Sequence, residues 1–586
     1  MNKTQLDLML KISNEGYTNQ REIAKSLGKS PGLINRIIKD LASDGYIDED
    51  FNLSKKAEDF IKLRSPENAI IVAAGFGLRM IPINIDCPKG LVEVRGEKMI
   101  ERLIKQAREA GINDIYIVVG YMKEKYEYLI DTYGVNLIVN DSYGTKNNIH
   151  SLAKACDKLS NSYVVPCDIW CAENPFNKKE AYSWYMLTND RARSFFKINK
   201  NSHLSPVISA YEGNKMMGLG YFTKSDSKTL SEIVGELCEN PQYDNERWEA
   251  CLLDKRMKNI WARVVNSHDY IGVNTYEELR SLDKGSKNLN AATIESLKEI
   301  LSVATGEIRD VELIKKGMTN RSFSFTCRGK KYVMRIPGSG TDKLIKRKEE
   351  ASVYKEIDNT GICSSPVYFN PDDGFKLSLY LENARPCDPE NWEEVKECME
   401  LLRRFHELDL KVDHDFDLFG QIDFYESLRK GPSSYSDYST VKKHLMSLRP
   451  FVEKYSDMKC LCHIDSVPDN FLFYVDDQGE EKLQLTDWEY AGMQDPHLDI
   501  AMFSVYSGYN KNEIDRLIDF YFSGSCPPKT RTKIYCYVSL SGLLWSNWCE
   551  YKYSLGLEFG EYSLNQYRYA KDFYKLAKKE ILKYED

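Results

Sequence analysis

The sequence predicts a multidomain chain that combines α/β and α+β folds, and three observations support this. Its 586 residues exceed what one hydrophobic core supports. Short apolar runs alternate with helical patterns from residue 66 to about 285, which is typical of a mostly parallel sheet covered by helices. Beyond residue 300, a strand hairpin pattern gives way to a long run of helical patterns. We therefore expect domains at 1–64, 66–285 and 290–586, with the charged segment 279–290 as a linker.

Composition and charge exclude several classes of protein. The formal net charge of −8 argues against a chain whose main task is to coat nucleic acid or an anionic membrane. No apolar stretch approaches the roughly 18 residues that a membrane helix needs, and the first residues lack the apolar core of a signal peptide. We therefore expect a cytoplasmic protein. Its 15 cysteines should be inert thiols, because none forms a repeated C-x₂-C zinc pattern.

Residues 1–64 are predicted to form short helices. The stretch "NQREIAKSLGKSPGLINRIIKDLASDGYI" contains two helical segments separated by a turn at Gly28, and the following residues suit a small β-wing. This pattern resembles the winged helix-turn-helix modules of bacterial regulators, which place the second helix in the major groove. Lys29, Arg36 and Lys39 are the cations that could meet DNA phosphates. Because basic and acidic residues nearly balance here, a docking or dimerisation role stays open beside DNA binding.

Apolar strands and helical connections alternate through residues 66–285. The runs "AIIVAA", "DIYIVVGY", "NLIVN" and "SYVVPCD" are predicted strands, and "KMIERLIKQAREAG" and "NNIHSLAKAC" have helical spacing. Ligands of such sheets bind beyond the carboxyl ends of the strands. The stretch "AAGFGLRMIPINIDCPKGL", which directly follows the first strand, therefore lies where a ligand is expected.

This glycine-rich stretch is predicted to hold an anion. Gly75 and Gly77 let the backbone pass close to a bulky anion and direct N–H groups at it. Arg79 can fork onto phosphate oxygens, and Lys89 adds a point charge from beyond a proline-rich bend. The spacing matches neither G-x-x-x-x-G-K-[ST] nor G-x-G-x-x-G. Two separately anchored cations suit a nucleoside triphosphate whose inner phosphorus is attacked while pyrophosphate leaves.

The segment "VAAGFGLRMIP…CPKGL" resembles the signature of sugar-phosphate nucleotidyltransferases, which have a Rossmann-like fold. With "TKNNIHSL" after "NDSYG", the resemblance is closest to bacterial CTP:phosphocholine cytidylyltransferases, and it covers residues 68–280. It implies that Lys89, with Arg79 beside it, stabilises the transition state, and that Asp168 holds Mg²⁺ with Asn274 as the second ligand. It places the nucleotide against Ala73, Ala74, Gly75, Gly77, Gly120, Tyr121, Asn147 and Asn148.

The headgroup of the second substrate is less closely defined. A quaternary ammonium group is bound by aromatic faces and a carboxylate. Trp184, Trp248 and Glu249 are the candidates for the choline moiety, although a tryptophan is as often part of the core. Gly272 stands where the family carries an acid, so phosphoethanolamine or 2-aminoethylphosphonate is an alternative substrate.

The last domain carries a kinase-like pattern. The motif H-x-D-x₄-N in "HIDSVPDNF", followed about 20 residues later by "TDWEY", is typical of the kinase catalytic loop and metal motif. Asp465 would accept the proton of an attacking hydroxyl group, and Asn470 and Asp487 would hold Mg²⁺. Phosphoryl transfer needs little beyond such positioning and charge neutralisation.

The segment ahead of this pattern supplies the rest of a nucleotide site. "KKGMTNRSF" places Thr319 and Asn320 at a turn able to cover phosphates, and Arg335 on a strand is expected to pair with Glu350 on a helix. The residues "MRIPG", "DWEYAG" and "LLWSNWCEY" resemble choline/ethanolamine kinases of the aminoglycoside phosphotransferase superfamily, over roughly residues 300–575. This implies a two-lobed kinase-like domain in which Trp545 and Trp548 line a cage for the choline cation. Their i, i+3 spacing puts both on one helix face, which would equally suit core packing.

The two catalytic patterns together predict a bifunctional enzyme of CDP-choline synthesis. A choline kinase would make phosphocholine from choline and ATP, and a cytidylyltransferase would join it to CTP with release of pyrophosphate. Both steps would use Mg²⁺, and the product would serve the decoration of bacterial surface glycans. A choline-responsive transcriptional regulator is the alternative from another class, and aminoglycoside phosphorylation is a third.

Overall fold

The computed structural model describes the chain except residues 208–211, 316–319, 338–344, 430, 457, 477, 555–558 and 585–586. It divides into two compact units, Met1–Gly306 and Glu307–Asp586. Helix α10 (Ala292–Leu301), which follows the expected linker, belongs to the first unit. The domain boundaries predicted from the sequence therefore stay a prediction. Within the described residues, no helix is both long and apolar enough to cross a membrane.

The first unit begins with the predicted winged helix-turn-helix. Its helices are α1 (Lys3–Glu15), α2 (Gln20–Ser26), α3 (Pro31–Ser43) and α4 (Lys55–Lys62). Polar side chains cap all four, as Ser30 does for α3 by accepting a hydrogen bond from the third residue of the helix. The face of α3 expected to be apolar is buried, and a bridge between Ile47 and Leu53 forms the wing. Helix α1 is tied to the next domain, because Lys179 Nζ donates to the backbone oxygen of Ser13 at 2.7 Å.

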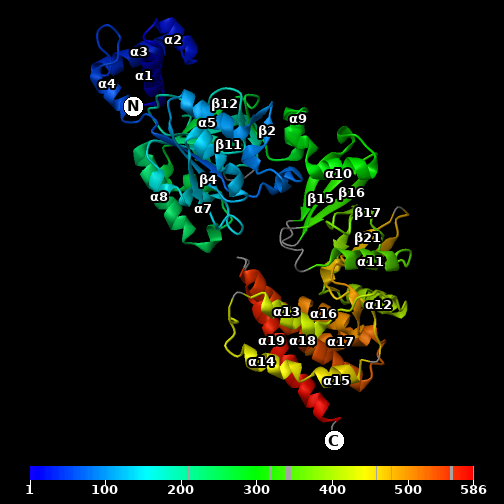
Figure 1. The fold of residues 1–586 in the computed structure, drawn as a ribbon. Coiled ribbons are helices and arrows are strands. Elements are labelled where there is room, and N and C mark those ends of the chain that lie inside the picture. Colours follow the sequence, from blue (N-terminus) through cyan, green and yellow to red (C-terminus); the bar gives the residue numbers. More distant parts are fainter. Residues whose placement is uncertain are drawn as a thin grey trace. The chain divides into compact units, whose positions relative to one another are not determined.

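A mostly parallel sheet forms the centre of the first unit, as predicted (Figure 1). Its strand order is β12-β8-β11-β6-β1-β4-β5. Strands β5, β4, β1 and β6 run parallel to one another, β12 is parallel to β8, and β11 is antiparallel to β6 and β8. The strand bounds are β1 (Asn68–Ala73), β4 (Asp114–Val119), β5 (Asn136–Val139), β6 (Ser162–Pro166), β8 (Trp184–Ala192), β11 (Gly213–Phe222) and β12 (Trp261–Val265).

Helices cover both faces of this sheet. Alternate residues of β1 enter two different cores: Ile71 packs with α5 (Met99–Glu109), and Ile70 packs with α7 (Asn148–Ala153) and α8 (Lys224–Cys238). This alternation follows from the two-residue period of a strand. Short strand pairs lie at the edges: β2 (Glu93–Val94) with β3 (Glu97–Lys98), β7 (Ile169–Cys171) with β13 (Tyr270–Gly272), and β9 (Phe196–Ile198) with β10 (Leu204–Pro206). Helices α6 (Tyr128–Tyr133) and α9 (Tyr276–Leu282) complete the connections.

The second unit has a small antiparallel sheet followed by a helical part, which is the predicted two-lobed outline (Figure 1). The sheet order is β14-β15-β16-β18-β17, and α11 (Arg347–Ile357) lies in the connection between β16 and β17. The strands are β14 (Arg309–Lys315), β15 (Asn320–Cys327), β16 (Lys330–Pro337), β17 (Tyr368–Phe369) and β18 (Lys376–Leu379).

One large apolar core holds the helical part together. Its longest helices, α18 (Pro528–Tyr553) and α19 (Glu561–Leu582), pack closely enough that a side chain on Gly542 would meet the backbone of α19 at 2.6 Å. Around them lie α12 (Trp392–Glu407), α13 (Leu418–Ser427), α14 (Tyr438–Met446), α15 (Arg449–Lys454), α16 (His497–Ser507) and α17 (Lys511–Tyr521). Short strands carry the loops of the second site: β19 (Arg385–Pro386), β20 (Cys460–Cys462), β21 (Phe471–Val475), β22 (Glu481–Leu485) and β23 (Gly492–Gln494).

Candidate functional site

The first candidate site lies beyond the carboxyl end of β6. Asp168 comes between β6 and β7, and Asn274 comes just after β13. The antiparallel pairing of β7 and β13 brings these two residues together, since it sets Gly272 opposite Ile169. The backbone N–H of Val273 also donates to the backbone oxygen of Asp168 at 2.8 Å. A carboxylate and an amide oxygen that are far apart in the sequence thus share one edge of the fold.

Lys89 and Arg79 converge on this pair. Lys89 Nζ donates to the carboxylate of Asp168 and, at 3.0 Å, to Oδ1 of Asn274. Arg79 Nη2 donates to the same Oδ1 at 2.9 Å. The side chain of Lys89 is 14% exposed, so its charge is only weakly screened by solvent. All four residues predicted for catalysis and metal binding in this domain therefore meet at one point.

The glycine-rich turn packs against Lys89. Gly77 has a left-handed backbone with φ of 61°, which favours glycine, and a Cβ there would lie 3.2 Å from Lys89 Cβ. Of the predicted nucleotide-binding residues, Ala73 ends β1 and Ala74 follows it, and a Cβ added to Gly75 would meet no atom within 4 Å. The turn thus places backbone and cation side by side.

Gly120 and Tyr121 close the next strand end against the same turn. Tyr121 N donates to Ala74 O at 3.0 Å, and a Cβ on Gly120 would approach that oxygen and the ring of Tyr143 to 2.8 Å. The ring of Phe76, within the turn, lies 5.1 Å from the rings of both Tyr121 and Tyr143. The sequence analysis missed Phe76 and Tyr143; an aromatic residue between the two glycines was the available signal.

Asn147 and Asn148 hold a loop at the start of α7. Asn147 Nδ2 donates to Asn245 O at 2.8 Å, and Asn148 Oδ1 accepts from Trp248 N at 2.8 Å. These contacts fix residues 245–248 beside the helix. Contact of the two asparagines with a nucleotide stays a prediction.

The three predicted headgroup residues differ in what they can still bind. Trp184 and Trp248 are buried in the two cores of the sheet, where Arg263 lies 4.4 Å over the Trp184 ring. Glu249 is 5% exposed; Tyr185 OH donates to its Oε1 at 3.1 Å. Its Oε2 is buried and has no hydrogen-bond partner among the described residues. Burial raises the pKa of Glu249. Within this trio, a cation would thus find its unused acceptor on Glu249.

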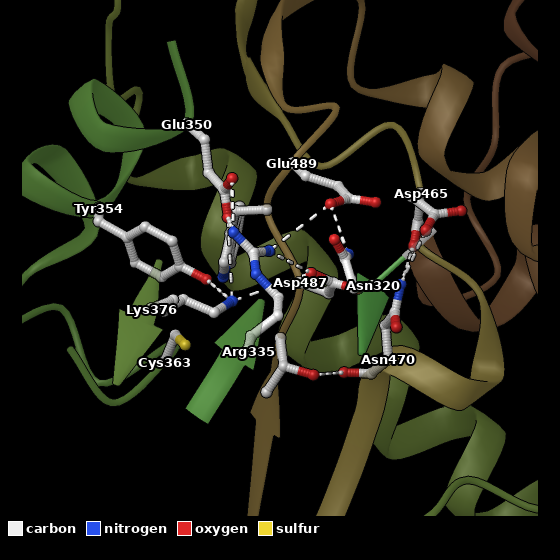
Figure 2. A network of polar contacts seen from close by, with 12 residues as sticks. Asn320, Arg335, Glu350, Tyr354, Cys363, Lys376, Asp465, Asn470, Asp487 and Glu489 are labelled. Carbon is white, nitrogen blue, oxygen red and sulfur yellow. Dashed lines mark hydrogen bonds and ion pairs between the residues drawn. The ribbon is translucent and has the colours of Figure 1, made fainter. Parts of the chain in front are cut away.

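The second candidate site is built on the loop from His463 to Asn470 (Figure 2). Asn470 Nδ2 donates to the backbone oxygen of Asp465 at 2.7 Å and to its carboxylate at 3.1 Å. Thr486 N donates to Asn470 O at 2.8 Å, which places Asp487 beside the loop. Asp487 has a left-handed backbone with φ of 68°, a strained conformation of the kind that clusters at functional sites.

Asp499 holds the backbone of this loop by hydrogen bonds. Its carboxylate accepts from the N–H groups of His463 at 2.8 Å and Ile464 at 2.7 Å, and His406 contacts it at 2.9 Å. Cys462, which lies near this carboxylate, donates its thiol to Gln494 O at 3.2 Å. The buried group of His406, Cys462 and Asp499 therefore serves to hold the loop in place.

Arg335 and Glu350 form the predicted ion pair. The Arg335 guanidinium lies 2.7 Å from the carboxylate of Glu350, and both residues are buried. Arg335 Nη1 also donates to Asp487 Oδ1 at 3.1 Å (Figure 2). The pair therefore joins the small sheet and α11 to the predicted metal ligand.

Further charged residues that the sequence analysis missed complete the cluster. Glu489 accepts from Asn320 Nδ2 at 2.9 Å and from Arg347 at 3.2 Å. Lys376 Nζ lies 3.8 Å from Asp487 Oδ1. The signal for Lys376 was faint, because it is a single charge on a strand, whereas Glu489 lies within the "TDWEY" motif already singled out. Thr319, predicted beside Asn320, lies outside the described residues.

The carboxyl groups of this site have divergent pKa values. Desolvation, with the charges of Asp487 and Glu489 added, raises the pKa of Asp465 well above its ordinary value. Burial, with the charge of Asp487 added, raises the pKa of Glu489 to about 6. Burial would also raise the pKa of Asp487, but Lys376 and Arg335 lower it below the ordinary value. Asp487 is therefore the group that stays ionised, as a metal ligand must.

Trp545 and Trp548 lie half-buried on α18, with ring centroids 5.8 Å apart and nearly perpendicular planes. Tyr490 is the last residue of the "TDWEY" motif, and its ring lies 6.4 Å from the ring of Trp545. Phe559 lies 5.1 Å from Trp548. Burial raises the pKa of Tyr490, and the charges of Glu489 and Asp465 add to the shift. A cluster of ring faces near carboxylates is what a small organic cation requires.

Three families of known proteins match separate parts of the chain. Residues 1–48 match a winged helix-turn-helix DNA-binding family, residues 69–179 match the MobA-like NTP transferase domain family, and residues 311–519 match the choline/ethanolamine kinase family. The segments follow the order expected from the sequence.

Curated relatives resemble the same segments. Choline-phosphate cytidylyltransferase of Streptococcus pneumoniae is 28% identical over 227 residues, 38% of this chain and 99% of the relative. 2-Aminoethylphosphonate cytidylyltransferase of Lancefieldella rimae is 31% identical over 190 residues, 31% of this chain and 77% of the relative. Protein LicA of Haemophilus influenzae is 27% identical over 262 residues, 42% of this chain and 96% of the relative.

Proposed function

Because the chain belongs to the cytidylyltransferase family and carries a choline/ethanolamine kinase domain, we propose that it makes CDP-choline in two steps. The kinase domain phosphorylates choline with ATP, and the cytidylyltransferase domain transfers CMP from CTP to phosphocholine. The observation that carries the proposal is that each unit gathers cations and oxygen donors at one point, around Asp168 in the first and Asp487 in the second.

In the cytidylyltransferase step, an oxygen of phosphocholine attacks the innermost phosphorus of CTP. Lys89 and Arg79 hold phosphate oxygens and offset the charge that develops there, while the glycine-rich turn presents its backbone N–H groups. The pyrophosphate that leaves is held by the same cations. Glu249, with its buried unpaired oxygen, attracts the cationic headgroup.

In the kinase step, the choline hydroxyl attacks the terminal phosphorus of ATP. Asp465 accepts the hydroxyl proton, and Asn470 keeps its carboxylate oriented through the hydrogen bond at 3.1 Å. The raised pKa of Asp465 suits a proton acceptor, since a stronger base takes the proton more readily. Trp545 and Trp548 hold the trimethylammonium group.

The oxygen donors of both sites fit Mg²⁺. Asp168 and Asn274 both accept from one ammonium group, so their oxygens already point at a single cation position. Asp487, with a lowered pKa, and Asn470 supply the same carboxylate and amide chemistry in the kinase domain. Held by these residues, Mg²⁺ would help to neutralise the negative charge of the phosphates.

A second candidate headgroup is 2-aminoethylphosphonate, which the relative from Lancefieldella rimae carries in its name. Pyrophosphate release from CTP, measured in turn with phosphocholine, phosphoethanolamine and 2-aminoethylphosphonate, ranks the three. If another headgroup is turned over and phosphocholine is not, phosphocholine is rejected as the substrate.

One experiment tests the two steps together. The chain is incubated with choline, ATP, CTP and Mg²⁺, and the products are identified by mass. We expect CDP-choline, and we expect the same product without ATP when phosphocholine replaces choline. CDP-choline from phosphocholine but not from choline would contradict the kinase assignment alone.

The N-terminal module adds DNA binding as a separate proposal, supported by the match of residues 1–48. Arg36 and Lys39 are exposed on α3, whereas the wing carries Asp48, Glu49 and Asp50. The helix rather than the wing would therefore meet phosphates. A salt-sensitive shift of a promoter fragment that Arg36→Ala abolishes would support this, and an unchanged shift would refute it.

A further inference from the structure

The second candidate site contains a largely buried cation, Lys376, that the mechanism above does not use. Lys376 begins β18 and is paired directly with Arg335 of β16 in the antiparallel register. Directly opposed residues project from the same face of a sheet. Arg335 and Lys376 therefore present two cations to the same space, beside α11 and Asp487 (Figure 2).

The contacts of Lys376 with the described residues leave part of its hydrogen-bonding capacity unused. Lys376 Nζ donates to Tyr354 OH at 2.8 Å, and it lies 3.8 Å from Asp487 Oδ1 and 3.9 Å from Glu350 Oε1. An ammonium group has three donors. The two carboxylates are attractive at those distances but too far for hydrogen bonds. Arg335, in contrast, hydrogen-bonds both carboxylates directly.

The position of Lys376 suits a further anionic ligand. Its side chain is only 13% exposed, so little water is available to satisfy its remaining donors. Tyr354, one helical turn after Glu350 on α11, holds the ammonium with a neutral hydroxyl. A largely buried lysine beside an arginine, with donors that no described residue accepts, is arranged for a ligand with several negative oxygens.

We propose that Lys376 binds the phosphates of the kinase nucleotide together with Arg335, and that Tyr354 positions its ammonium group. The inference rests on the proposed kinase function. In this arrangement Glu350 fixes the planar guanidinium of Arg335, while Lys376 supplies a point charge that can follow the phosphate oxygens. The cation pair is split between adjacent strands, so no single motif in the sequence contains it.

The test compares Lys376→Met with Lys330→Met, an exposed lysine at the start of β16 that serves as the control. Binding of ADP and of adenosine to the full chain is measured by calorimetry with Mg²⁺, and KM is measured for ATP and for choline. We expect Lys376→Met to weaken ADP binding and raise KM for ATP by roughly tenfold to a hundredfold, the value of a charged hydrogen bond. Adenosine affinity and KM for choline should stay within twofold, and Lys376→Arg should restore part of the loss.

If Lys376 had a purely structural role, its replacement would lower the affinities for ADP and adenosine by the same factor. Equal losses of the two affinities would therefore overturn the inference, and so would an unchanged affinity for ADP. If Lys376→Met lacks a cooperative unfolding transition, Tyr354→Phe decides. That variant should weaken ADP binding severalfold and leave adenosine binding intact, and equal binding of ADP by Tyr354→Phe and the parent would refute the positioning role. If the parent chain makes no phosphocholine, the proposed function fails, while the ADP titration still judges Lys376.

Discussion

Replacement of Lys89 by methionine gives a direct test of the first site. Methionine keeps the aliphatic stem beside Gly77, where an added Cβ would lie 3.2 Å from Lys89 Cβ, and removes the ammonium group. That group now joins Asp168 and Asn274. In the substituted chain Arg79 is the remaining cation of the described cluster, held at 2.9 Å from Asn274 Oδ1.

The expected size of the effect follows from the geometry. A phosphate oxygen at the 3.0 Å that separates Lys89 Nζ from Asn274 Oδ1 would gain about 5–6 kcal/mol at an effective dielectric constant of about 20. Desolvation offsets part of this, and removal of one preorganised donor in other enzymes costs about 3–4 kcal/mol. We therefore expect the rate of CTP-dependent pyrophosphate release to fall by about 10²–10³-fold.

The assay has two controls within the same molecule. Phosphorylation of choline by the second unit should be unchanged, which shows that the chain is folded and active. Lys123→Ala removes a lysine whose side chain is 47% exposed and paired with Glu124, and it should leave both activities intact. A Lys89→Met chain that releases pyrophosphate within threefold of the parent rate would refute the assignment of Lys89.

Three further predictions concern other parts of the chain. Asp465→Asn should slow choline phosphorylation by about 10²–10⁴-fold, with CTP turnover unchanged; an ADP-release assay above one tenth of the parent rate would contradict this. Lys533→Met leaves Asp495, 1% exposed, without its buried cation, and should lower the free energy of unfolding of the second unit by about 3–5 kcal/mol in urea. Burial alone would raise the pKa of Asp495, but His497 and Lys533 lower it below the ordinary value. The stabilisation by the Lys533–Asp495 ion pair is therefore present above a pH of about 4 and is lost as the pH falls further. Because burial raises the pKa of Glu249, protonation occurs at higher pH than in an exposed glutamate; KM for phosphocholine should rise as pH falls through that pKa, and Glu249→Gln should remove this dependence.

Sequence patterns predicted helices and strands well where the apolar residues follow the period of the element that buries them. The apolar run of β1 is buried at every position, and the apolar face of α3 is buried as expected. The antiparallel insertion of β11 between β6 and β8 was beyond such patterns, because strand direction within a sheet depends on long connections rather than on local residues.

The site residues could be predicted from the sequence where they lie within a short motif. Lys89 and Asp168 lie in motifs with known spacing, and the structure brings them together. Lys376 lies in no motif, and its position beside Arg335 depends on strand pairing. Glu489 lies within the quoted "TDWEY" motif, but its contacts come from Asn320 and Arg347 elsewhere in the chain. For Trp184 and Trp248 the sequence left core and ligand roles open, and their burial shows how strongly large aromatic residues serve the core.

The two sites share an electrostatic arrangement that explains how each awaits its nucleotide. In both, the carboxylate assigned to Mg²⁺ is paired with a cation assigned to phosphate, Lys89 with Asp168 and Arg335 with Asp487. A buried carboxylate left alone would take up a proton and lose its value as a ligand. In the second site burial would raise the pKa of Asp487, but Lys376 and Arg335 lower it below the ordinary value. The ion pair with Arg335 is thus one reason that Asp487 stays ionised, and it leaves the same guanidinium in place to meet a phosphate oxygen.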